Sequence, residues 1–315
     1  MKKVSILIPA YNEEKSLPLL HSELNKVMTA NNQYEWEVLF VNDGSSDCTL
    51  QLIKEWRVTD KRICYVDLTR NFGKEIAMLA GFDYVTGDCV VVMDADLQHP
   101  PHLIPQMLQH WEEGYEDVYA RRTTRGKENW FRKHISLSYY KLLQKLTHGN
   151  IQQNVGDFRL LDRKCIQSLQ KLRECERYSK GLFCWIGYKK KEICYHSNDR
   201  ITGYSKWNFW NLLNLGINGL TSFTIAPLRL SSIIGFIISL VAFTYMCIVL
   251  VKALIWGDPV QGFPSLMIVI LFLGGVQLIS LGVIGEYLGR IFNETKNRPT
   301  YIAREYNDRS CVDCK

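Results

Sequence analysis

The sequence predicts an α/β domain with a mostly parallel sheet, followed by a membrane-associated carboxyl-terminal part. Over the first part of the chain, short β-rich runs alternate with longer helical patterns, which is typical of a doubly wound, Rossmann-like sheet. Polar motifs follow the ends of several of these runs. Beyond residue 230, two apolar stretches are each long enough to cross a bilayer.

Four β-rich runs are the expected strands of this sheet. They are Val4 to Ile8, Trp36 to Val41, Ile63 to Asp67 and Cys89 to Met93. Helical spacing fills the intervals at Glu13 to Ala30, Cys48 to Arg57 and Lys74 to Val85. Because ligands of such sheets gather beyond the carboxyl ends of the strands, the expected site lies at residues 9–13, 42–45 and 94–98.

The composition changes near residue 231. Ser231 to Val251 and Pro264 to Gly285 are almost uninterrupted apolar stretches. Arg229 precedes the first, and the second is followed by Arg290, Lys296, Arg298 and Arg304. Because basic flanks favour the cytoplasmic side, we expect both termini in the cytoplasm and the hairpin tip outside. No cleavable leader pattern opens the chain, so the first domain is expected to stay cytosolic.

The segment just before the first apolar stretch has the pattern of an amphipathic helix. One face carries Asn208, Asn211, Asn214 and Asn218, and the other face is apolar. Its position before two spans favours a helix lying in the membrane interface. Its polar face lacks Lys and Arg, so a helix packed on the first domain is the alternative.

These patterns predict four parts. They are a cytoplasmic domain at 1–206, an interfacial amphipathic helix at 207–228, a two-helix hairpin at 229–290 with spans at about 231–251 and 264–285, and a cytoplasmic tail at 291–315. A chain that ends near Ala226 is expected to fold by itself.

Charge and cysteine usage narrow the class of partner. The formal net charge is +6, but Lys and Arg are mixed with many acids and no aromatic-basic RNA motif occurs, so a membrane surface or a phosphorylated substrate fits better than nucleic acid. Many of the ten cysteines lie inside apolar runs, as free thiols do in a reducing compartment. Cys311 and Cys314 lack further ligands for a zinc site, so a disordered tail is favoured there.

Two carboxylates follow the fourth strand-like run. Asp94 and Asp96 are separated by one small residue, and Gln98 offers another oxygen. Mg²⁺ or Mn²⁺ is usually held by one or two carboxylates together with substrate phosphates, so this position predicts a divalent-cation site. Asp43 ends the second strand in a turn, where Gly44 allows close backbone approach and the carboxylate can accept hydrogen bonds from a nucleoside.

Four motifs occur in an order that resembles a known family. They are Pro9-Ala-Tyr-Asn-Glu-Glu14, Val41-Asn-Asp-Gly-Ser45, Asp94-Ala-Asp-Leu-Gln-His-Pro-Pro101 and Gly156-Asp-Phe-Arg-Leu160. The chain resembles family 2 glycosyltransferases with a GT-A fold. More narrowly, it is similar to the polyprenyl-phosphate branch, which includes dolichol-phosphate mannose synthases and bactoprenol glucosyltransferases, and its two-span tail is similar to the latter.

The resemblance implies a role for each matched residue. The nucleotide-sugar would contact Pro9, Tyr11, Glu13, Asp43, Asp94, Ala95 and Arg122. Mg²⁺ or Mn²⁺ would be held by Asp94, Asp96 and Gln98. The phosphates of donor and acceptor would contact Arg122, Lys180, Arg200, Ser205 and Lys206. Such cations suit a site that holds two phosphorylated substrates together.

Asp96, Asp157 and Arg159 are the expected catalytic residues. Asp157 either orients the acceptor or acts as a base, and an ion pair between Asp157 and Arg159 is the purely structural alternative. His99 and His102 share no metal-ligand spacing with another His and are interpreted as loop residues.

The expected reaction is a metal-dependent, inverting transfer. The phosphate of undecaprenyl phosphate would attack the anomeric carbon of a UDP-sugar, with UDP-glucose as first choice and UDP-N-acetylglucosamine, GDP-mannose or a UDP-aminoarabinose-type donor as alternatives. The expected location is the inner membrane of a bacterium. Family analogy adds a flippase and an outward-facing glycosyltransferase as pathway partners.

Two other functions are disfavoured. A processive polysaccharide synthase needs more than two spans, and the chain has no Gln-x-x-Arg-Trp sequence. A catalytically silent membrane scaffold would not need intact Asp43, Asp94 and Asp96. A homo-oligomer stays open, because Gly285 and Gly289 permit a close helix contact without requiring one.

Overall fold

The protein divides into two compact units in a computed structural model. The first comprises Met1–Asn214 and Arg298–Lys315, and the second comprises Leu215–Asn297. The structure describes residues 1–122, 155–175, 177–195, 262–307 and 309–310, together with short pieces between 228 and 248.

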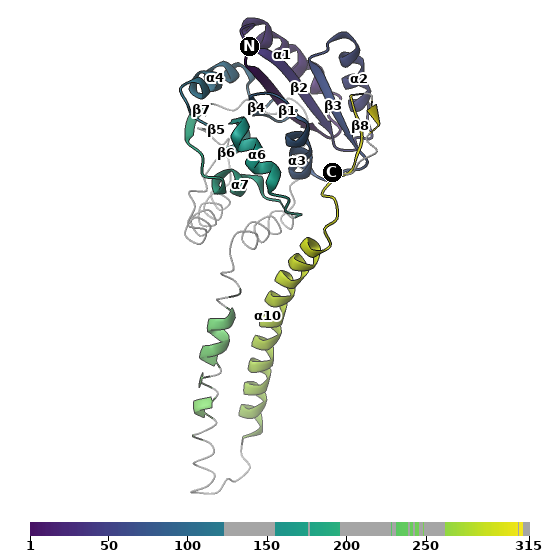
Figure 1. Cartoon of the computed structure of the whole chain (residues 1–315). Helices are drawn as coiled ribbons and strands as arrows, with labels where there is room; N and C mark the ends of the chain where they lie inside the picture. The colour runs from purple at the N-terminus through teal and green to yellow at the C-terminus, as the bar shows by residue number, and fades with distance from the viewer. Residues whose placement is uncertain are drawn as a thin grey trace. The chain divides into compact units, whose positions relative to one another are not determined.

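The first unit is built on a mixed sheet (Figure 1) rather than the mostly parallel sheet predicted from the sequence, because β6, β8 and β9 pair antiparallel with their neighbours. Its strand order, within the described residues, is β7-β5-β6-β4-β1-β2-β3-β8-β9. The four strands predicted from the sequence are confirmed as β1 (Lys3–Ala10), β2 (Glu35–Asn42), β3 (Ile63–Leu68) and β4 (Cys89–Val92). They run parallel to one another. Three further strands extend the sheet beyond β4: β5 (Asp117–Arg122), β6 (Val155–Asp162) and β7 (Lys190–Tyr195).

Helices cover both faces of this sheet. They are α1 (Leu17–Ala30), α2 (Thr49–Thr59), α3 (Lys74–Tyr84), the 3-10 turn η1 (Pro101–Leu103), α4 (Ile104–Glu112), α6 (Arg163–Lys171) and α7 (Ser179–Trp185). Successive strand residues point to opposite faces. Ile6 and Ile8 pack in a core with α1, α2 and α4. Leu7 faces α3, where a Cβ on Gly81 would lie 2.1 Å from the Leu7 side chain, so the helix and the strand pack closely there.

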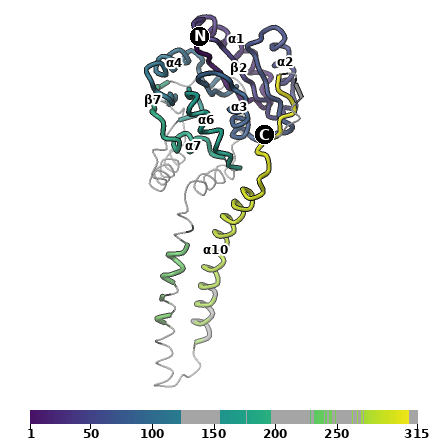
Figure 2. The backbone as a smooth tube through the Cα atoms, viewed as in Figure 1, coloured from purple at the N-terminus to yellow at the C-terminus, as the bar shows by residue number. Residues whose placement is uncertain are grey.

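The sheet continues into the carboxyl-terminal segment. Strand β8 (Ala303–Tyr306) pairs antiparallel with β3, and β9 (Arg309–Ser310) follows it, in the yellow part of the chain in Figure 2. The tail predicted at 291–315 thus contains two strands of the sheet. The four-residue run Ala-Arg-Glu-Tyr is short and polar, and it pairs as a strand only beside β3. A chain that ends near Ala226 would therefore lack one neighbour of β3.

Side chains fasten this segment to the domain. Tyr301 is 2% exposed, and its hydroxyl donates to Asp83 Oδ2 at 2.7 Å. The Lys54 ammonium contacts Glu305 at 2.6 Å. These contacts join the end of the chain to α3 and α2, which lie more than two hundred residues earlier in the sequence.

In the second unit the structure describes the long helix α10 (Phe263–Thr295). It includes the predicted span 264–285 and continues ten residues beyond it. Within the described residues, Phe272–Thr295 is the one helix that is long and apolar enough to cross a membrane. A shorter apolar helix, Ser231–Tyr245, falls in the region of the first predicted span. The predicted interfacial helix at 207–228 lies outside the described residues, apart from Leu228.

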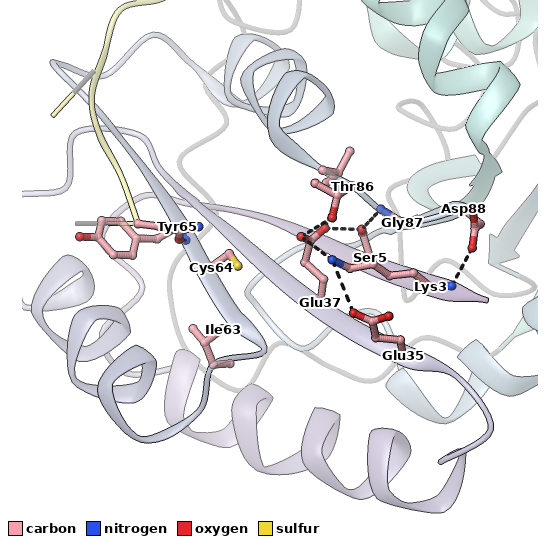
Figure 3. A network of polar contacts seen from close by, with 12 residues as sticks. Lys3, Ser5, Glu35, Glu37, Ile63, Cys64, Tyr65, Thr86, Gly87 and Asp88 are labelled. Atoms are coloured by element: carbon pink, nitrogen blue, oxygen red, sulfur yellow. Dashed lines mark hydrogen bonds and ion pairs between the residues drawn. The ribbon is translucent and has the colours of Figure 1, made fainter. Parts of the chain in front are cut away.

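A buried carboxylate joins β1, β2 and the turn before β4 (Figure 3). Glu37 accepts hydrogen bonds from Ser5 Oγ at 2.5 Å and from the backbone and hydroxyl of Thr86 at 2.9 and 2.7 Å. Lys3 lies 3.4 Å away. Burial raises the pKa of Glu37, but these hydrogen bonds and Lys3 outweigh burial and leave the pKa below its usual 4.5.

Loss of the Tyr301 ring is expected to destabilise the first unit strongly. Tyr301→Ala should lower the free energy of unfolding by about 3–5 kcal/mol, as for other buried aromatic truncations. Tyr301→Phe keeps the ring and loses one hydrogen bond, so it should cost only about 1 kcal/mol. Denaturant unfolding of the full chain in detergent measures both. Equal and small effects would show that the segment does not brace the domain.

Acid should weaken the fold partly through Glu37. Its pKa is lower in the folded state than in the unfolded chain, so its stabilisation is present above pH 4.5 and is lost as the pH falls through the lower folded value. Glu37→Gln should therefore reduce stability at pH 7 and flatten the fall in stability below pH 4.5. Parallel curves of melting temperature against pH for both proteins would contradict this assignment.

Candidate active site

The predicted motifs meet at the carboxyl edge of the parallel strands. The turns after β1 and β2 are hydrogen-bonded together, because Asn12 N donates to Ser45 Oγ at 3.0 Å and Ser46 N donates to Asn12 Oδ1 at 2.8 Å. Strand β6 runs antiparallel to β4 and pairs Arg159 with Val92. Asp157 therefore lies beyond the end of β4, where Asp94 begins its loop.

Asp43 holds a neighbouring loop in place. It is 3% exposed and accepts hydrogen bonds from the backbone of Phe72 at 2.7 Å and Gly73 at 2.9 Å. Burial raises its pKa, and the two backbone donors offset only part of that rise. Gly44 has φ +66°, and a Cβ there would lie 2.5 Å from the carbonyl carbon of Arg70. The turn and the loop 70–73 therefore fit each other closely.

The other predicted nucleotide residues lie along the first turn. Pro9 is the penultimate residue of β1, and Tyr11 is 45% exposed beyond it. Glu13 accepts a hydrogen bond from Ser16 Oγ at the start of α1, and its backbone donates to Thr49 Oγ1 at 2.9 Å. Of this set, Tyr11 offers the most open surface for a planar ligand.

The loop after β4 is held in a strained backbone conformation. Leu97 has φ +61°, which is uncommon for a branched, non-glycine residue. Ala95 is 4% exposed, while Asp94 and Asp96 are partly exposed on either side of it. Asp96 Oδ1 accepts a hydrogen bond from Gln98 N at 3.1 Å. The loop therefore buries its small residue and presents both carboxylates.

His99 anchors this loop to strand β6. It is 1% exposed, stacks on Phe158 with ring centroids 5.0 Å apart, and accepts a hydrogen bond from Asp94 N through Nδ1 at 3.0 Å. Burial lowers its pKa more than nearby Asp94 raises it, which favours the neutral ring. Sequence reasoning missed this role, because nothing local distinguishes His99 from the exposed His102.

A lysine joins Asp94, in the loop after β4, to Asp157 in strand β6. Lys74 Nζ lies 2.6 Å from Asp94 Oδ1 and 2.5 Å from Asp157 Oδ2. Burial opposes charge on all three groups, but their mutual attraction outweighs it: the pKa of Lys74 is raised, and those of Asp94 and Asp157 are lowered. Sequence reasoning also missed Lys74. The one sequence feature that sets Lys74 apart is its position as the first residue of α3, where the helix dipole disfavours a cation.

Arg122 and Gln98 bind each other in this structure. Arg122 ends β5 and donates to Gln98 Oε1 at 3.0 Å and to the Tyr195 hydroxyl at 3.0 Å. The Gln98 side-chain oxygen, predicted from the sequence to be a metal ligand, thus accepts a hydrogen bond from the Arg122 guanidinium. The arrangement places an arginine beside the loop that carries Asp96.

Arg159 and Asp157 have separate partners. Arg159 is 3% exposed, pairs with buried Asp117 at 3.1 Å and stacks over Phe183 at 3.9 Å. Burial raises the pKa of Asp117, and Arg159 offsets part of that rise. The structure therefore favours neither the ion pair between Asp157 and Arg159 nor an exposed Arg159 at the site edge.

Of the residues expected to bind phosphate, the structure describes Arg122 and Lys180. Lys180 lies in the first turn of α7, and its charge helps to lower the pKa of Asp157. Ser179 N donates to Glu75 Oε2 at 2.9 Å, which ties α7 to α3. Arg200, Ser205 and Lys206 lie outside the described residues.

The donor set fits a divalent cation shared with substrate. Among the described residues, no group of three His, Cys, Asp or Glu side chains converges as a complete metal site. Asp94 and Asp96 nevertheless offer two carboxylates on one short loop. Mg²⁺ needs only one or two protein carboxylates when substrate phosphates supply further oxygens.

The fold and the site define a family 2 glycosyltransferase. Residues 5–169 match the family model "Glycosyl transferase family 2", and residues 226–291 match the "GtrB C-terminal hairpin". The chain belongs to glycosyl transferase family 2.

Full-length relatives narrow the comparison. The glycosyltransferase CsbB of Bacillus subtilis is 47% identical over 304 residues, 96% of this chain and 92% of that protein. The SfII prophage-derived bactoprenol glucosyl transferase of Shigella flexneri is 40% identical over 303 residues, 96% of this chain and 98% of that protein. Glucosyl-3-phosphoglycerate synthase from Mycobacterium tuberculosis superposes with a TM-score of 0.46 at 17% identity, over 69% of this chain and 75% of that chain.

Proposed function

We propose that the protein transfers a sugar from a nucleotide-sugar to undecaprenyl phosphate, with UDP-glucose as the first candidate donor. The observation that carries this proposal is the meeting of Asp94, Asp157 and Lys74 at the edge that also carries Asp96 and Arg122. This edge combines carboxylates for a divalent cation with cations for phosphates. The bactoprenol glucosyl transferase relatives, aligned over 96% of the chain, support the choice of acceptor and sugar.

Each group has a task in the proposed reaction. Asp94 and Asp96 would hold Mg²⁺ or Mn²⁺, which would supply positive charge against that of the departing diphosphate. Pro9 at the end of β1, Tyr11 and Asp43 are assigned to the nucleoside side of the site. Arg122, Lys180 and, in the part of the chain beyond the described residues, Arg200, Ser205 and Lys206 are assigned to the phosphates. Attack from the face opposite the leaving group would invert the anomeric carbon.

The acceptor needs little help to lose a proton. A phosphate monoester is largely dianionic at neutral pH, because its second pKa is about 6. Lys74 and Lys180 lower the pKa of Asp157, and a carboxylate with a lowered pKa is a weak base. We therefore propose that Asp157 is not the base. It would instead help to orient the acceptor by holding Lys74 in place. The main physical task is to bring two anionic substrates together.

Chain connectivity supports a membrane protein whose two flanking segments lie on one side of the bilayer. Strand β8 pairs with β3, although the hairpin segment lies between them in the sequence. Two strands of one sheet must lie on the same side of a bilayer, so the segment between them crosses an even number of times if it crosses at all. This agrees with two spans and with both termini on one side, which the basic flanks of the spans lead us to assign to the cytoplasm. The lipid product would then need a flippase and an outward-facing transferase.

Purified protein should form glucosyl-phosphoryl-undecaprenol and UDP from UDP-glucose, undecaprenyl phosphate and Mg²⁺. UDP-N-acetylglucosamine, GDP-mannose and a UDP-aminoarabinose donor, each assayed in parallel, should react more slowly. Asp96→Asn removes a ligand charge at constant size and should lower turnover at least about 100-fold. Glu23→Gln, at an exposed position of α1, is the matched control. Normal turnover in Asp96→Asn would remove the metal role, and a faster alternative donor would replace glucose.

The pH profile should report the substrate rather than Asp157. Single-turnover transfer by the wild type should rise with an apparent pKa of about 6, that of the lipid phosphate. Asp157→Asn should keep the same rise at lower amplitude, because it disturbs Lys74 without removing a base. A rise that disappears in the variant would make Asp157 the general base instead.

A further inference from the structure

Lys74 occupies a carboxylate that the proposed metal also needs. Its ammonium lies 2.6 Å from Asp94 Oδ1 and 2.5 Å from Asp157 Oδ2, so a single cation joins the loop after β4 to strand β6. Asp94 is the same residue that we assign to the divalent cation. The single charge of Lys74 and the double charge of the metal would repel each other at one carboxylate, so Lys74 and the metal compete for Asp94.

The two partners of Lys74 differ in accessibility. The Asp94 side chain is 26% exposed, whereas that of Asp157 is 8% exposed. The Lys74 side chain is 42% exposed and has a flexible four-carbon stem. Asp157 Oδ1 is buried without a hydrogen-bond partner among the described residues, so Asp157 depends on Lys74 for most of its compensation. Asp94 is therefore the partner that Lys74 can release.

We propose that Lys74 is a resident counter-ion that occupies Asp94 until a divalent cation arrives together with the donor diphosphate. The metal alone must displace an ammonium from Asp94 and gains only two carboxylates in return. A diphosphate brings further oxygen ligands and negative charge, which offset the repulsion between the metal and Lys74. Lys74 then stays on Asp157. The site would thus take up metal mainly with its donor, and this inference rests on the proposed metal role of Asp94.

Mn²⁺ binding to the full-length protein in detergent tests this inference without any turnover. Electron paramagnetic resonance counts free Mn²⁺, with and without UDP. Lys74→Met removes the competing charge and should bind Mn²⁺ without UDP at least about tenfold more tightly than the wild type. Lys74→Gln keeps N–H donors for both aspartates and should show the same gain. With saturating UDP, the difference from the wild type should shrink.

Matched controls separate the possible outcomes. Lys26→Met removes one positive charge from the exposed surface of α1 and should leave Mn²⁺ affinity unchanged. Lys74→Arg keeps the charge and should keep affinity without UDP at the wild-type level. Unchanged or weaker Mn²⁺ binding in Lys74→Gln without UDP would overturn the counter-ion role. Failure of the wild type to bind Mn²⁺ even with UDP would instead overturn the metal site itself.

Discussion

The site depends on bringing two carboxylates to one place, one from the loop after β4 and one from strand β6. Strand β6 enters the sheet antiparallel beside β4, so the start of β6 and the end of β4 share an edge. Asp157 and Asp94 therefore approach the same point, where burial would penalise two negative charges. Lys74 makes this arrangement possible by contacting both. The same cation fixes the first residue of α3 at the site.

Helix α3 is held at its other end by the carboxyl-terminal segment. Asp83, near the end of α3, accepts the Tyr301 hydroxyl at 2.7 Å and forms a salt bridge with Arg173 at 2.7 Å. Between these ends, Gly81 lets the helix pack directly on Leu7 of β1. The position of Lys74 is thus set by packing along the whole helix. A segment that follows the hairpin in sequence contributes to the placement of a residue in the site.

The features that the sequence predicted are the local ones. Each parallel strand is a short β-rich run followed at once by its polar motif, so Asp43, Asp94 and Asp96 could be placed at the sheet edge from spacing alone. Lys74 and His99 could not be assigned, because their partners come from other elements. The pairing of Arg122 with Gln98 is likewise a contact between the end of β5 and the loop after β4. Strand β8 was missed because its four residues acquire strand character only beside β3.

In the proposed reaction, two anionic substrates meet at an edge that carries both cations and carboxylates. A sugar hydroxyl acceptor is served best by a base with a pKa near the working pH, whereas Lys74 and Lys180 lower the pKa of Asp157 against the opposing effect of burial. A phosphate acceptor carries its own negative charge, so its approach to a diphosphate is opposed by repulsion rather than by proton transfer. Lys74, Lys180 and Arg122 reduce that repulsion. In the proposed reaction these cations would therefore serve the donor diphosphate and the acceptor phosphate alike.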